Sequence, residues 1–153
     1  MSQYLTDQKT QLTIRRSIKA PRQRVFDAWT QPEYLQHWWQ KEPGWYTEIA
    51  EVDLRVGGKY RLGMRAPEVP HAYVCYGKFT EIKEPEKLVY TWSWEPPGME
   101  VGETLVTVEF VDLGDSTEVV LTHERFPHAE AVGGHTKGWE GCLGFLATYV
   151  ETD

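Results

Sequence analysis

Three histidines late in the sequence are the first candidates for chemistry. His123 ends a predicted strand on its apolar side, where an imidazole could orient a ligand or act as a general base if that side faces a cavity. The alternative for this position is a structural histidine bonded to the backbone. His128 and His135 follow, near Glu124 and Glu130, but this spacing matches no metal-binding motif, so we predict no metal site.

Asp53 and Arg55 are the second candidates, two residues apart and next to a pair of glycines. The pattern predicts a tight hairpin turn at Val56-Gly57-Gly58, where glycine adopts a positive φ at little cost. One interpretation is an ion pair that fixes this hairpin, which is worth at most about 1 kcal/mol when exposed. The other is that Arg55 binds the carboxylate of a ligand.

The sequence contains no further catalytic motif. Its glutamates gather at predicted turns, as on a solvated surface, rather than as a pair held at a defined separation. It has no P-loop, GxGxxG or nucleophile elbow, and we predict no cofactor. Cys75 lies in the middle of a predicted strand and Cys142 on an apolar helix face, so both are expected to be reduced thiols of a cytoplasmic protein.

The composition of the 153 residues is typical of one globular domain, with 41% apolar and 25% charged residues. The formal net charge of −7 argues against a nucleic-acid partner. Residues 1–10 are expected to be loosely ordered and carry no signal-peptide pattern, and no stretch reaches the roughly 18 apolar residues that span a bilayer. We expect a single domain over residues 1–153 without stable membrane insertion, either a monomer or a homodimer.

Aromatic residues are the candidates for ligand binding. The chain has seven tryptophans, eight tyrosines and five phenylalanines, and the segment 87–95 carries an alternating aromatic face. Tyr and Trp bring polar tips that suit an amphipathic ligand, although a fully packed core is the alternative. The predicted ligand-binding set is Tyr60, Met64, Tyr73, Tyr90, Trp92, Trp94, Met99, His123, Trp139, Leu143 and Leu146.

An amphipathic helix is predicted at Gly138–Val150, and its apolar face would cover the strands that carry these residues. Gly141 and Gly144 lie off its apolar arc, and each costs about 1 kcal/mol relative to alanine inside a helix. Either packing elsewhere tolerates them, or they leave room beside the helix for a ligand. The apolar arc, at 100° per residue, consists of Trp139, Cys142, Leu143, Leu146 and Val150.

The predicted elements together indicate an α+β domain. A strand at 11–18 leads into a helix after Pro21 and a second short helix, which a capping box from Thr30 to Glu33 would begin. Short turns would pair the strands as an antiparallel sheet that the final helix covers, with a long link at 126–137 before it. The other strands are predicted at 47–55, 59–65, 72–82, 87–95, 103–112 and 117–124.

Several short motifs, spread over most of the chain in this order, give a family resemblance. They are Ile18–Pro21, Val25–Thr30, Pro32-Glu33, Trp38-Trp39, Val52–Gly58, Gly77–Ile82, Leu88–Trp92, Leu121–His123 and Gly138-Trp139. With them the sequence resembles the helix-grip superfamily of the START domains and the birch-pollen allergen. Within that superfamily it resembles the activator of heat-shock-protein-90 ATPase homologue family.

The resemblance implies a curved antiparallel sheet of six to seven strands wrapped around the last helix, with a cavity between them. We therefore expect a protein that binds a small apolar or amphipathic molecule rather than an enzyme. A cyclase, aromatase or hydrolase activity on the same fold is the alternative, with His123 as its candidate group. A chaperone remains a candidate partner, although the eukaryotic activators carry an additional N-terminal domain that these residues do not include.

Overall fold

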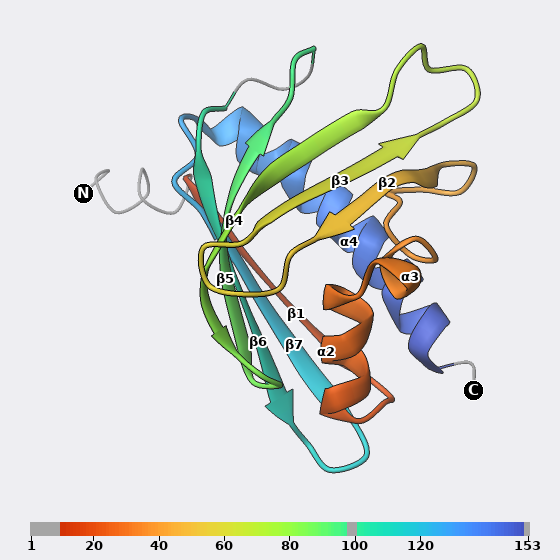
Figure 1. Cartoon of the computed structure of the whole chain (residues 1–153), viewed down its shortest axis with the longest axis vertical. Coiled ribbons are helices and arrows are strands. Elements are labelled where there is room, and N and C mark those ends of the chain that lie inside the picture. Colours follow the sequence, from red (N-terminus) through yellow and green to blue (C-terminus); the bar gives the residue numbers. More distant parts are fainter. Residues whose placement is uncertain (1–9, 98–100, 152–153) are drawn as a thin grey trace.

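The computed structural model describes residues 10–97 and 101–151. Its seven strands form one antiparallel sheet in the order β1-β7-β6-β5-β4-β3-β2. Figure 1 shows this sheet curling around the long helix α4, with the short helices α2 and α3 beside the C-terminal half of α4. The strands are β1 (Gln11–Ile18), β2 (Tyr46–Val52), β3 (Lys59–Arg65), β4 (Tyr73–Lys83), β5 (Lys87–Trp94), β6 (Thr104–Asp112) and β7 (Thr117–Glu124), and the helices are α2 (Arg22–Thr30), α3 (Pro32–Leu35) and α4 (Ala129–Glu151).

This architecture confirms the predicted helix-grip fold, and strands such as β1 and β5 bury residues of the face that their alternation indicates. In β1, Leu12 and Ile18 are buried against α4, while Arg16 on the same side of the pattern remains exposed. In β5, Tyr90 and Trp92 are buried at 4% and 3% exposure, as the aromatic alternation predicted. Within the described ranges, no helix is long and apolar enough to cross a membrane.

Helix α4 begins at Ala129, nine residues earlier than predicted. The predicted link at 126–137 is therefore wrong over most of its length. Ala131 and His135 are buried one turn apart and continue the stripe of Trp139, so the apolar face of the helix simply extends. The continuation is hard to see in the sequence because histidine is a polar residue. The adjacent Gly133-Gly134 pair also favours a loop, because glycine is a poor helix former.

Two local predictions about turns also need correction. The hairpin connection between β2 and β3 is a six-residue loop, 53–58, rather than a three-residue turn, and the Asp53 N–H donates to the Lys59 carbonyl across it at 2.9 Å. At the start of α3 the predicted capping box is absent, since the Thr30 hydroxyl donates backwards to the Phe26 carbonyl at 2.9 Å. The interpretation of Asp53 and Arg55 as an exposed hairpin ion pair is confirmed, with Nε and Oδ2 2.9 Å apart.

A close approach between α4 and the loop that follows α3 explains one of the two glycines that lie off the predicted apolar arc. A Cβ built on Gly141 would lie 1.9 Å from the carbonyl oxygen of Lys41, whereas a Cβ on Gly144 would meet nothing within 4 Å. Gly141 therefore allows the backbone at Lys41 to rest directly on the helix. This contact holds the loop against the middle of α4, next to Gly138 and Cys142, which line the candidate site.

Candidate functional site

A cavity of about 360 Å³ lies between α4, the strands β3, β4 and β5, and the loop after α3. Aromatic side chains make up most of its wall, and the side chains of Lys41 and His135 supply its basic groups. The residues that line it are Trp39, Lys41, Met64, Tyr73, Trp92, Trp94, Gly134, His135, Gly138, Trp139 and Cys142.

Five residues of the predicted ligand-binding set meet at this cavity: Met64, Tyr73, Trp92, Trp94 and Trp139. The three tryptophan rings pack in contact, since the Trp92 and Trp139 centroids are 5.3 Å apart and those of Trp92 and Trp94 are 5.4 Å apart. They come from β3, β4, β5 and α4, which the curled sheet brings together. Met99 lies outside the described residues.

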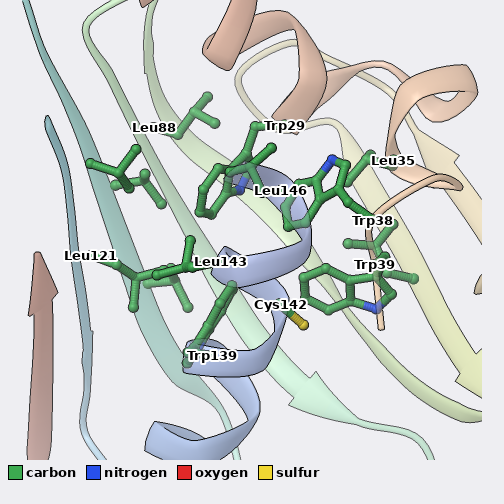
Figure 2. Packing of buried hydrophobic residues seen from close by; sticks show 14 of the residues in the cluster. Trp29, Leu35, Trp38, Trp39, Leu88, Leu121, Trp139, Cys142, Leu143 and Leu146 are labelled. Carbon is green, nitrogen blue, oxygen red and sulfur yellow. The ribbon is translucent and has the colours of Figure 1, made fainter. Parts of the chain in front are cut away.

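The other described members of the predicted set do not line this cavity, although all of them are buried. The Tyr60 hydroxyl donates to the Thr91 carbonyl at 2.6 Å, and Tyr60 lines a second hollow beside β3 and β4. The Tyr90 hydroxyl accepts a hydrogen bond from Trp29 Nε1 at 3.2 Å. Burial raises the pKa of both phenols, so both stay protonated. Leu143 and Leu146 pack in the hydrophobic cluster that Figure 2 shows around α4.

His123 is fully buried beneath the cavity and every polar atom of its ring is used. Its Nδ1 accepts from Trp139 Nε1 at 3.0 Å, because an indole nitrogen can only donate. The proton of the neutral ring is therefore on Nε2, which donates to Thr104 Oγ1 at 2.8 Å, and that hydroxyl donates to the Trp92 carbonyl at 3.0 Å. Burial, together with neighbouring His135, lowers the pKa of His123 to about 2. His123 thus holds Trp92 and Trp139 in place as a neutral structural side chain.

His135 is the histidine that reaches the cavity wall. The sequence makes it a candidate for chemistry but predicts it in a link, outside the ligand-binding set. Its Nε2 accepts from Trp94 Nε1 at 2.9 Å, which places the ring proton on Nδ1, 2.7 Å from the Ala131 carbonyl. Burial lowers its pKa. The spacing of four residues from Trp139 is the signal that could have placed it on the same helix face.

Trp39 and Lys41 were also missed, because they lie in a loop whose path the sequence does not show. Trp38 packs in the core, where its indole N–H donates to the Ala28 carbonyl at 2.9 Å. Its neighbour Trp39 lines the cavity instead. Figure 2 shows Trp39 beside Cys142 on α4. Lys41 Nζ lies 4.6 Å from the ring centroid of Trp45 and 5.8 Å from that of Tyr73, two cation–π contacts at the cavity.

The two thiols are unsuited to nucleophilic chemistry. Cys75 and Cys142 are free and buried, and Cys142 lines the cavity. Burial raises the pKa of Cys142 to about 12, and that of Cys75 also rises well above its ordinary value. Both are protonated at neutral pH, and a thiol is a much weaker nucleophile than a thiolate. Within residues 10–97 and 101–151, no three His, Cys, Asp or Glu side chains gather as metal ligands.

Comparison with known proteins agrees with the fold. A crystal structure of a protein from Chromobacterium violaceum matches with a TM-score of 0.84 at 26% identity, over 94% of this chain and 99% of that chain. The AHSA1-like protein from Aeromonas hydrophila matches with a TM-score of 0.76 at 25% identity, over 92% of each chain. A protein from Nitrosomonas europaea shares the fold, with a TM-score of 0.78 at 22% identity over 95% of this chain and 96% of that chain.

No curated protein matches the sequence significantly. The family model of the Activator of Hsp90 ATPase homolog 1-like proteins matches residues 19–151, which is most of the chain. The protein therefore belongs to the Activator of Hsp90 ATPase homolog 1-like family.

Proposed function

We propose that this protein binds a small, mostly apolar molecule in the cavity between α4 and the sheet. The observation that carries the proposal is the cavity itself, about 360 Å³ in volume and lined mainly by aromatic rings. Small-molecule sites occupy about 300–1,000 Å³ and combine an apolar lining with a few polar groups. A volume at the lower end of this range suits a ligand of one or two fused rings.

The chemistry of the wall favours binding over catalysis. A general base needs a free lone pair within reach of the substrate, and the acceptor nitrogen of His135 is already bonded to Trp94 Nε1. The acceptor nitrogen of His123 is bonded to Trp139 Nε1 in the same way. The Cys142 thiol is protonated, so it offers no nucleophile. The two histidines hold the tryptophan rings of the wall in place instead of exchanging protons.

Substituting Gly138 with leucine is expected to abolish binding without unfolding the protein. Gly138 lines the cavity on α4, and a Cβ at this position would meet no atom within 4 Å, so the new side chain enters open space. Replacing a helix glycine by leucine also raises helix propensity by up to about 1 kcal/mol. The measurement is a fluorescence titration with the amphipathic aromatic probe 8-anilinonaphthalene-1-sulfonate, which we expect to saturate at one site in the wild type.

The matched control is Gly144→Leu, which adds the same side chain to the same helix. Gly144 also has no atom within 4 Å of an added Cβ, but it does not line the cavity. We expect this variant to bind the probe as the wild type does. If Gly138→Leu kept the wild-type affinity while remaining folded by circular dichroism, the cavity would not be the binding site.

A further inference from the structure

Four indole N–H groups, three of them buried and that of Trp94 half-buried, have acceptors within the fold. Those of Trp29 and Trp38 bond to the Tyr90 hydroxyl and the Ala28 carbonyl in the core. That of Trp94 bonds to His135 in the cavity wall, and that of Trp139 bonds to His123 behind it. The fold therefore supplies an acceptor to indole donors both in the core and at the wall, as is usual for buried polar groups.

Trp39 and Trp92 are the exceptions. Both indole nitrogens are buried, and none of the described residues accepts a hydrogen bond from either. The two side chains are only 2% and 3% exposed, both line the cavity, and their ring centroids are 6.0 Å apart. An unpaired buried donor costs free energy that a suitable acceptor would recover. Two such donors, on side chains that both line one cavity, point to an acceptor that is not part of the chain.

A positive charge lies at the same cavity. Lys41 is half-buried there between the faces of Trp45 and Tyr73, and no carboxylate of the described residues lies within salt-bridge distance of its ammonium group. The chain carries seven more negative than positive charges, so many carboxylates were available to pair with this lysine. The cation is instead held by aromatic faces and left free for an anion.

We propose that the ligand is a small aromatic carboxylate, whose ring system occupies the aromatic cavity and whose carboxylate is bound by Lys41 and the indole N–H groups of Trp39 and Trp92. This inference rests on the proposed binding function and adds the chemical class of the ligand. The carboxylate supplies two oxygens with lone pairs for the unpaired donors, and its charge pairs with the lysine ammonium group. The remaining wall contacts the rings through dispersion and edge-to-face packing.

Isothermal titration calorimetry with three probes of the same ring system separates these contributions. The probes are 2-naphthoate, which carries charge and acceptors, 2-naphthamide, which carries an acceptor without charge, and 2-methylnaphthalene, which carries neither. We expect the wild-type affinity to fall in that order, with each step on the order of 5- to 10-fold, as one charge-assisted or neutral hydrogen bond would give. The difference between the first two probes reports the ammonium group, and that between the last two reports the indole donors.

The variant Lys41→Met tests the charge, because methionine keeps the apolar reach of the side chain and leaves the backbone carbonyl against Gly141 unchanged. We expect the variant to bind 2-naphthoate roughly 5- to 10-fold more weakly than the wild type does. Its affinity for 2-naphthamide should stay within about 2-fold of the wild-type value. Lys59→Met is the matched control, since Lys59 is exposed on β3 and lines the second hollow instead of the cavity. It removes one positive charge elsewhere and should leave all three affinities unchanged.

The outcomes distinguish the carboxylate assignment from the proposed binding of a ligand in the cavity. Equal affinities for the three probes, or an equal loss in Lys41→Met and Lys59→Met, would overturn the carboxylate assignment while leaving cavity binding intact. If none of the probes bound to the wild type, both proposals would fall. The chemical class of the ligand would be established by two results together. The affinity must fall from 2-naphthoate to 2-naphthamide to 2-methylnaphthalene, and Lys41→Met must lose affinity for 2-naphthoate alone.

Discussion

Gly141→Ala is expected to destabilise the protein by about 1–3 kcal/mol, the usual cost of inserting a group into a packed site. The added Cβ would lie 1.9 Å from the carbonyl oxygen of Lys41 and 2.8 Å from the carbonyl carbon. Both are backbone atoms, so no flexible side chain can move aside. The loop that carries Trp39 and Lys41 must shift off the helix, and the variant should also lose affinity for 2-naphthoate.

The matched variant Gly144→Ala should show the opposite sign. Nothing lies within 4 Å of a Cβ at this position, so the substitution only exchanges a poor helix former for a good one. We expect a gain in stability of up to about 1 kcal/mol. Urea unfolding of both variants, followed by circular dichroism, measures the difference. If Gly141→Ala were as stable as Gly144→Ala, the loop would not be held against the helix as the structure indicates.

Mild acid is expected to destabilise the protein through its buried histidines. The pKa of His123 is about 2 in the folded state against an ordinary value of about 6.5, so between these values the unfolded chain binds the proton and the folded chain does not. The free energy of unfolding is therefore highest above pH 6.5 and falls as the pH decreases. Linkage gives a loss of about 2 kcal/mol from His123 between pH 7.5 and pH 5. The lowered pKa of His135 adds a loss of the same sign.

Urea unfolding at pH 7.5 and pH 5 measures this effect above the range in which most carboxylates titrate. His123→Gln provides the comparison, because glutamine does not titrate and its amide can still bond to neighbouring polar groups. The variant should be less stable than the wild type at pH 7.5 and should show a shallower dependence on pH. An NMR titration of the wild type gives a second readout, and a His123 ring that protonated near pH 6.5 would contradict the buried, neutral assignment.

The fold could be predicted from the sequence because its signals are local and repeat along the chain. The alternation in segments such as 11–18 and 87–95 gives the strands, and the short connections give their antiparallel pairing. The start of α4 was not predicted, because Gly133-Gly134 opposes helix formation locally and the burial of Ala131 and His135 outweighs it. Tertiary packing decided that boundary.

The candidate site was only half predictable, for a physical reason. Residues of the strands and of α4 that face inward follow from periodicity, which found Trp92, Trp94 and Trp139. Periodicity cannot tell which inward residues face a cavity and which fill the core, so Tyr90 and Leu143 were included although they are packed. Trp39 and Lys41 belong to a loop whose path depends on the contact at Gly141, and no local pattern encodes that contact.

The most direct test of the central proposal, a ligand in this cavity, is an NMR titration of the wild-type protein with 2-naphthoate that follows its seven indole N–H signals. Four tryptophans line the cavity, and Trp29, Trp38 and Trp45 do not. We predict the largest shifts at the four, with the Trp39 and Trp92 protons moving downfield as they gain an acceptor. Saturable binding with its largest shifts at Trp29, Trp38 or Trp45, or no change at any signal, would contradict the proposal.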